Sequence, residues 1–133
     1  MKNKILVLVS LLIIIIPSIG LAEVPGVIKE FCEIHFNNQI ANIGEPFNAT
    51  DINKKNLPFR RIIDFAVTSS TAYLWYEHGG RGYHQHVVAF STINPNEIYR
   101  SCIFLEYIKH KSILDLLKDN RLLEQCLIKA EHL

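Results

Sequence analysis

The fold is decided by residues 60–92, which read RRIIDFAVTSSTAYLWYEHGGRGYHQHVVAFST. In this stretch β-branched and aromatic residues follow a two-residue alternation, which is typical of strands. Ser69-Ser70 and the glycine-rich segment 79–82 interrupt the alternation, and both are typical of tight hairpin turns. We therefore expect two consecutive antiparallel hairpins, with strands at 60–68, 71–78 and 83–92.

Turns with two residues at the tip fix the register of both hairpins. The first turn then pairs Phe65 with Leu74. The second turn places Glu77 opposite His84 and Trp75 opposite His86. Alternation assigns these residues to a core face: Ile63, Phe65, Val67, Ala72, Leu74, Tyr76, Val87 and Ala89. The other face is mixed, with aromatic, acidic and imidazole groups: Ile62, Asp64, Tyr73, Trp75, Glu77, His84, His86, Val88 and Phe90.

The flanking segments add helices and a fourth strand. Residues 25–42 carry an apolar stripe at helical spacing, and 45–58 is a polar loop with a glycosylation sequon at Asn48. A fourth strand is expected at 97–107, with Cys102 on the mixed face. A C-terminal helical segment starts at Ser112, which is placed as an N-cap. The order predicts an α+β domain: an N-terminal helix, a four-stranded antiparallel β-meander and a C-terminal helical segment, both helices packed on one face of the sheet.

Residues 1–22 have the order of a secretory signal peptide. Two lysines come first, an apolar run from Ile5 to Ile16 follows, and Gly20 and Ala22 are the small residues before the cleavage site. The run is shorter than the about 20 apolar residues of a membrane-spanning helix. We therefore expect cleavage after Ala22, no membrane span in the mature chain, and a periplasmic or extracellular location.

Residues 23–133 are enough for a single small domain with a core, but not for two domains. Removal of the two lysines of the signal peptide changes the formal net charge from +1 to −1. This near-neutral balance argues against nucleic acid or an anionic membrane surface as the main partner.

Three cysteines, Cys32, Cys102 and Cys126, allow one internal disulfide in three possible pairings. An oxidising compartment favours such pairing. If both helices cover the same face, Cys32 and Cys126 lie in the helical layer and Cys102 lies on the opposite face. We therefore favour a Cys32–Cys126 disulfide, with the other two pairings left open.

His84 and His86 form an H-x-H pair, and the expected register adds Glu77 across from His84. Two imidazoles and a carboxylate are a ligand set for zinc or another divalent transition metal, with one position left for water. A plain cross-strand ion pair explains the same residues without a metal. The pattern therefore defines one alternative, a metal-binding protein or small metallohydrolase.

The other candidate site is a protein-binding surface on the same hairpin. Tyr73 and Trp75 lie on the face that the helices are expected to leave uncovered, and Tyr83 lies close to the turn. Arg81 places a long cation at the glycine-rich tip, where it can contact a carboxylate of a partner. Exposed aromatic groups around a cation are typical of interaction surfaces.

The sequence therefore favours an exported interaction module of the cell envelope, of inhibitor or immunity type, whose partner is another envelope or secreted protein. An enzyme is the less favoured expectation, because the motifs contain no complete catalytic set. No cofactor is expected apart from the divalent metal of the alternative.

Overall fold

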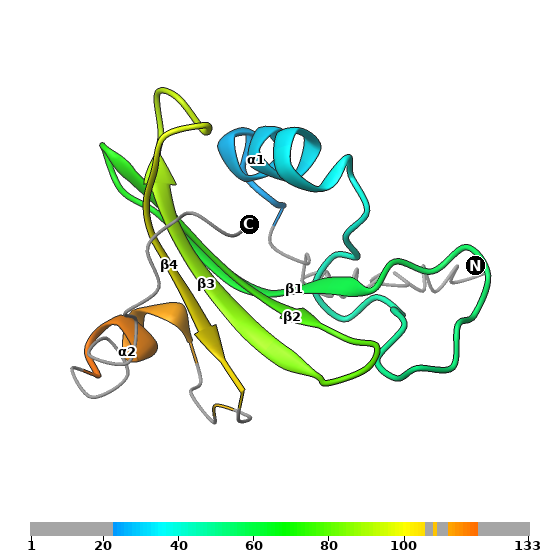
Figure 1. Cartoon of the computed structure of the whole chain (residues 1–133). Coiled ribbons are helices and arrows are strands. Elements are labelled where there is room, and N and C mark those ends of the chain that lie inside the picture. The colour runs from blue at the N-terminus through cyan, green and yellow to red at the C-terminus, as the bar shows by residue number, and fades with distance from the viewer. Residues whose placement is uncertain (1–22, 106–107, 109–111, 120–133) are drawn as a thin grey trace, which may run out of the picture.

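A computed structural model describes residues 23–105, 108 and 112–119, and the elements follow the expected order. The helices are α1 (Gly26–Phe36) and α2 (Ile113–Leu117). The strands are β1 (Arg60–Val67), β2 (Thr71–His78), β3 (His84–Ser91) and β4 (Ile98–Phe104). They form one antiparallel sheet in the order β1-β2-β3-β4, so the α+β class and the meander are confirmed (Figure 1).

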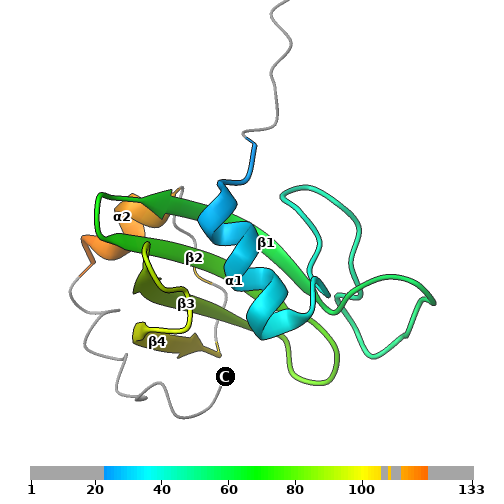
Figure 2. The same ribbon diagram turned by 90° about the horizontal axis from the view of Figure 1, so that it is seen from above.

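The sheet is curved, and the two helices cover opposite faces of it (Figure 1). Figure 2 shows α1 lying across the face that is nearer the viewer from above. The expectation that both helices share one face is therefore wrong. The physical reason is that both faces of β2 are apolar, so each face needs a covering layer.

The α1 face carries the larger core. Four helical side chains, Ile28, Phe31, Cys32 and Phe36, are buried against the sheet. Their partners on the strands are Ile62, Ala72, Leu74, Tyr76, Val88 and Phe90. The rings of Phe31 and Phe90 stack with centroids 4.1 Å apart, which fixes the helix over β3.

α1 ends at Phe36, before the expected limit at residue 42. Asn37 and Asn38 adopt left-handed conformations, with φ of 49° and 58°. Their amides donate to the carbonyl oxygens of Glu33 and Cys32, at 3.1 Å in each case. Asparagine tolerates this conformation, so the pair closes the helix without glycine.

The α2 face carries a second core, of Trp75, Val87, Cys102, Phe104, Ile113 and Leu116. The Ser112 hydroxyl accepts from the Asp115 amide at 3.2 Å, so the expected N-cap is confirmed. Cys102 lies on the face of Trp75, as expected from alternation. That face, however, is a packed core rather than an open surface.

The register of the first hairpin is confirmed from Asp64 to Val67, and that of the second is wrong by one residue. Before Asp64 the first register shifts, so Ile62 lies on the α1 face and Ile63 on the α2 face, the reverse of the expectation. Phe65 pairs with Leu74, and a bulge lies between Ile62 and Asp64. In the second hairpin His78 pairs with His84, so the loop spans residues 79–83. A shift of one residue turns every side chain of a strand to the other face. β3 therefore places His84, His86, Val88 and Phe90 on the α1 face, and Val87 and Ala89 on the α2 face.

Gly79 explains the shift. A Cβ at this position would lie 1.9 Å from the carbonyl oxygen of Asn48, and the Gly79 amide donates to the Phe59 carbonyl at 2.8 Å. Gly79 therefore packs against the preceding loop instead of pairing with Gly82. Gly80 and Gly82 have φ of 92° and 79°, which glycine adopts without strain.

The loop 45–58 is organised around Asn48, which is only 2% exposed. Its side-chain amide donates to the carbonyl oxygens of Lys54 and Leu57, and its Oδ1 accepts from the Lys54 amide. The sequon asparagine is therefore a structural residue, and a glycan does not fit on it in the folded chain. No helix within the described ranges is long and apolar enough to cross a membrane.

Candidate functional site

Trp75 does not contribute to an open surface. It is 2% exposed, and its indole Nε1 donates to Oε1 of Gln85 at 3.1 Å. The second core covers the ring with Ile113 and Leu116. The proposed role of Trp75 as a binding residue is therefore wrong, because the helix expected on the opposite face lies on this one.

Tyr83 and Glu77 belong to a buried polar network beside Trp75. The Tyr83 hydroxyl donates to Glu77 at 2.7 Å and accepts from the Gln85 side chain at 2.9 Å. Arg61 Nε donates to the other oxygen of Glu77 at 2.7 Å. Both carboxylate oxygens of Glu77 are thus engaged by protein groups, and the network orients these side chains on the α2 face.

The expected metal set of Glu77, His84 and His86 does not assemble. Glu77 pairs with Gln85 rather than with His84, so its carboxylate and the two imidazoles point to opposite faces of the sheet. Within the residues that the structure describes, no three His, Cys, Asp or Glu side chains are already arranged around one metal position.

A cluster of three histidines takes the place of that set, at the loop end of β2 and β3. The rings of His78 and His84 stack with centroids 5.0 Å apart, and those of His84 and His86 lie 4.7 Å apart. His86 also stacks on Tyr76 at 4.7 Å. The sequence analysis did not include His78, because only the observed register, shifted by one residue, places it directly opposite His84.

Burial and nearby cations lower the pKa values of two of the three rings, His86 and His78. The pKa of His86 falls to about 4, first because the ring is desolvated and then because His84, His78 and Arg60 disfavour a further charge. The pKa of His78 is lowered by the same causes, desolvation first and Arg60 second. The Nδ1 atom of His86 is buried without a hydrogen-bond partner.

Arg81 lies at the exposed tip of the β2–β3 loop, as expected. Its side chain forms no hydrogen bond or ion pair with the described residues. The three glycines around it each have a structural reason, given above. The tip therefore presents a single cation on a loop whose backbone is fixed by the fold.

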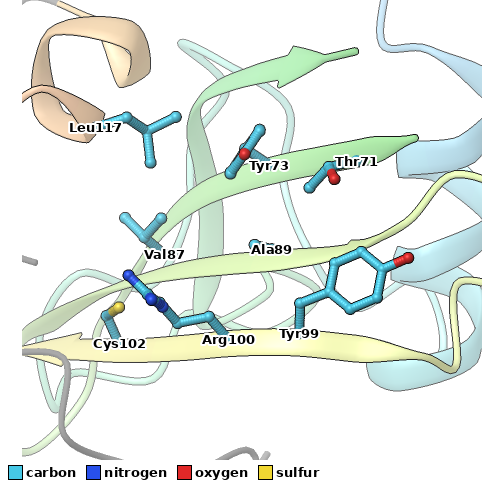
Figure 3. Close-up of a pocket in the computed structure, with 8 residues that line it drawn as sticks. All are labelled: Thr71, Tyr73, Val87, Ala89, Tyr99, Arg100, Cys102 and Leu117. Carbon is cyan, nitrogen blue, oxygen red and sulfur yellow. The ribbon is translucent and has the colours of Figure 1, made fainter. Parts of the chain in front are cut away.

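A groove on the α2 face lies beyond the end of α2 and has a volume of about 370 Å³. Its walls come from the three strands β2, β3 and β4 and from Leu117 of α2: Thr71, Tyr73, Val87, Ala89, Tyr99, Arg100, Cys102 and Leu117. Figure 3 shows the Arg100 side chain pointing into the space between β4 and Leu117. The groove combines two tyrosines, an apolar floor and one cation.

Tyr73 is thus the predicted aromatic residue that reaches an accessible site, while Tyr99 and Arg100 were missed. With Cys102 expected on the mixed face, strict alternation along the fourth strand puts Tyr99 on the core face. A bulge between Ala89 and Phe90 disturbs the pairing with β4 at this point, and Tyr99 is 51% exposed. The sequence signal for this site is the adjacent pair Tyr99-Arg100 near the start of the fourth strand.

The cysteines do not pair as expected. Cys32 is a buried free thiol on α1, and burial raises its pKa to about 11. Cys102, on the opposite face, is disulfide-bonded and does not titrate. The favoured Cys32–Cys126 disulfide is therefore wrong on the side of Cys32, whose thiol is buried in the α1 core without a disulfide. Cys126 itself lies outside the described residues.

Comparison with protein-family models, with curated proteins and with solved structures finds no match for this chain.

Proposed function

We propose that the chain is a small exported protein-binding module, of inhibitor or immunity type, whose main contact surface is the groove on the α2 face. The observation that carries the proposal is the lining of that groove by Tyr73, Tyr99 and Arg100 around an apolar floor. Its volume of about 370 Å³ falls within the range of binding pockets.

The chemistry of the groove defines the segment that it accepts. Val87, Ala89 and Leu117 provide contacts for an apolar side chain, and the tyrosines provide flat contact area at low entropic cost. Arg100 is the charged member of the lining and is solvent-exposed, so it favours a carboxylate next to that side chain. The partner therefore offers an apolar residue followed or preceded by Asp or Glu.

The Arg81 tip is the second contact in this proposal. The tip and the groove lie at opposite ends of the β2–β3 hairpin, since Thr71 begins β2 and His78 ends it. One partner that engages both must span the length of the hairpin. Export is part of the proposal. An intact mass of the recovered protein that corresponds to a chain beginning at Glu23 supports export, and a mass that corresponds to a chain beginning at Met1 contradicts it.

Site-specific photo-crosslinking in the cells that produce the protein tests the groove. A benzophenone amino acid replaces Tyr99 at the groove or, as a control, Ile52, which is 71% exposed in the loop 45–58. We expect one discrete adduct from position 99, lost when Arg100→Glu is added, and no such adduct from position 52.

Equal adducts from both positions would show random collision and would contradict a binding groove. An adduct that survives Arg100→Glu contradicts the assigned role of the cation. Mass spectrometry of the adduct identifies the partner peptide, which should contain the apolar and acidic residues described above.

A further inference from the structure

We propose that His78, His84 and His86 bind one divalent transition-metal ion of the zinc and copper class at the loop end of the β2–β3 hairpin. The proposal concerns the α1 face and the tip of the hairpin, so it does not depend on the groove of the α2 face.

The backbone places the three imidazoles in a chelating pattern. His84 and His86 are two residues apart on β3 and project to the same side, and His78 is directly across from His84 on β2. Imidazole nitrogens at about 2.0 Å from a tetrahedral zinc ion put the ring centroids about 5 Å apart. The observed centroid distances are 5.0 Å and 4.7 Å, so the spacing of neighbouring rings already matches.

Hydrogen bonds to the backbone define the tautomer of two of the rings, but they do not bring the three rings around one metal position. Nδ1 of His78 donates to the Gly79 carbonyl at 2.8 Å, and Nδ1 of His84 donates to the Gly82 carbonyl at 2.7 Å. A donor at Nδ1 leaves the lone pair on Nε2, and this is the second-shell arrangement of metal-binding histidines.

His86 supplies an independent observation. Its Nδ1 is buried and has no hydrogen-bond partner, and a buried nitrogen of this kind is unusual enough to require an explanation. Ligation of a metal ion through this Nδ1 would give the buried nitrogen a partner.

Binding requires rotation of the rings, because the imidazoles of His78 and His84 are stacked with 21° between their planes. Arg60 and Tyr76 face the cluster, and Arg60 is the cation. Arg60 opposes any added positive charge. Metal ions bind the neutral form of imidazole, so the ligands must be free of protons.

The test uses mature, tag-free protein stripped with a chelator and titrated with Zn²⁺ in a calorimeter, with Cu²⁺ as a spectroscopic probe. We expect one equivalent to bind. Each of His78→Gln, His84→Gln and His86→Gln should weaken zinc binding at least tenfold. His35→Gln is the matched control, since His35 lies on α1 and contacts the Pro95 carbonyl instead, and it should bind like wild type.

Electron paramagnetic resonance of the Cu²⁺ complex of the wild-type protein should report three coordinated imidazole nitrogens, which keeps the proposal testable if His86→Gln does not fold. Absence of stoichiometric zinc binding overturns the proposal. So does a folded His86→Gln variant that binds like wild type, because the site would then be a cross-strand pair. Equal weakening by His35→Gln overturns it as well, since binding would not be specific.

Discussion

Leu74 and Trp75 show at the scale of single residues why one strand gave a half-correct interpretation. They are neighbours on β2 and point to opposite faces, and both are buried. Alternation sorted them correctly onto two faces. It gave no information about whether a second layer covers the face of Trp75, since that layer comes from residues 112–119, far along the chain.

Substitution of either residue, as in Trp75→Ala or Leu74→Asp, should therefore destabilise the fold severely. Trp75→Ala leaves a large cavity and removes the donor to Oε1 of Gln85, which costs about 3–5 kcal/mol of unfolding free energy. Leu74→Asp buries a carboxylate without a partner and should prevent folding. Urea unfolding of the variants measures this, with the half-exposed Tyr99→Ala as a control that changes stability little. A mild Trp75→Ala variant would contradict the α2 face as a packed core.

His86 predicts an acid-sensitive fold. Its pKa is lowered to about 4 in the folded chain, mainly by desolvation, against about 6.5 in the unfolded chain. The unfolded state therefore takes up a proton first, so stability is full above about pH 6.5 and decreases as the pH falls toward 4. The decrease should approach about 3 kcal/mol from this group.

Melting curves at pH 7 and pH 5 in the presence of a chelator check this expectation. His86→Gln should reduce the difference between the two temperatures, whereas His35→Gln should leave it in place. Identical pH dependence in wild type and His86→Gln would assign the effect to other groups.

Arg81 is expected to act in binding and not in folding. Arg81→Ala should weaken partner binding by about 2 kcal/mol, as for a buried interface anchor. The melting temperature should stay unchanged because the side chain is exposed. Arg81→Lys should recover only part of the affinity, since lysine lacks the planar two-point contact. Wild-type affinity of Arg81→Ala would remove the tip from the interface and leave the groove.

At the scale of elements, the β2–β3 hairpin marks the limit of local rules. Local rules were sufficient for the first turn, between β1 and β2, and the pairing of Phe65 with Leu74 was predicted correctly. The second turn did not, because Gly79 contacts Asn48 some thirty residues earlier in the chain. A periodicity argument has no access to such a contact. The predicted metal set with Glu77 failed because of this register shift. The prediction of an open Trp75 face failed because α2 covers that face.

Gly79→Ala tests the contact that sets the register. The new Cβ would meet backbone atoms of Asn48 and Ala49, which cannot rotate away, so we expect a loss of about 2 kcal/mol or more. Gly26→Ala is the matched control, because nothing lies within 4 Å of its added Cβ. Denaturant melts of both variants compare the effects, and equal stability of the two would mean that the loop 45–58 does not fix the hairpin.

At the scale of the whole molecule, the two cores have different cysteine chemistry. Cys32 is free in the α1 core, and Cys102 is disulfide-bonded on the α2 face. Since the chain contains three cysteines, Cys126 is the intramolecular partner that we predict for Cys102. Closing this loop should contribute about 3–4 kcal/mol by the chain-entropy relation.

Non-reducing peptide mapping of the purified protein should recover a Cys102–Cys126 peptide pair. Cys32 should react with alkylating reagents only after unfolding, because its thiol is buried and its pKa is near 11. Cys102→Ser should lower stability strongly and Cys32→Ala much less. A recovered peptide pair that contains Cys32 would contradict this arrangement.

Coverage of the sheet from opposite ends of the chain has a consequence for biosynthesis. The α1 core draws on residues up to Ile98, so it can close while the last part of the chain is still being synthesised. The aromatic face of Trp75 has no cover until Ile113 and Leu116 have emerged. A nascent chain stalled between these points exposes the apolar α2 face of the sheet, and a chaperone has most to protect during this interval.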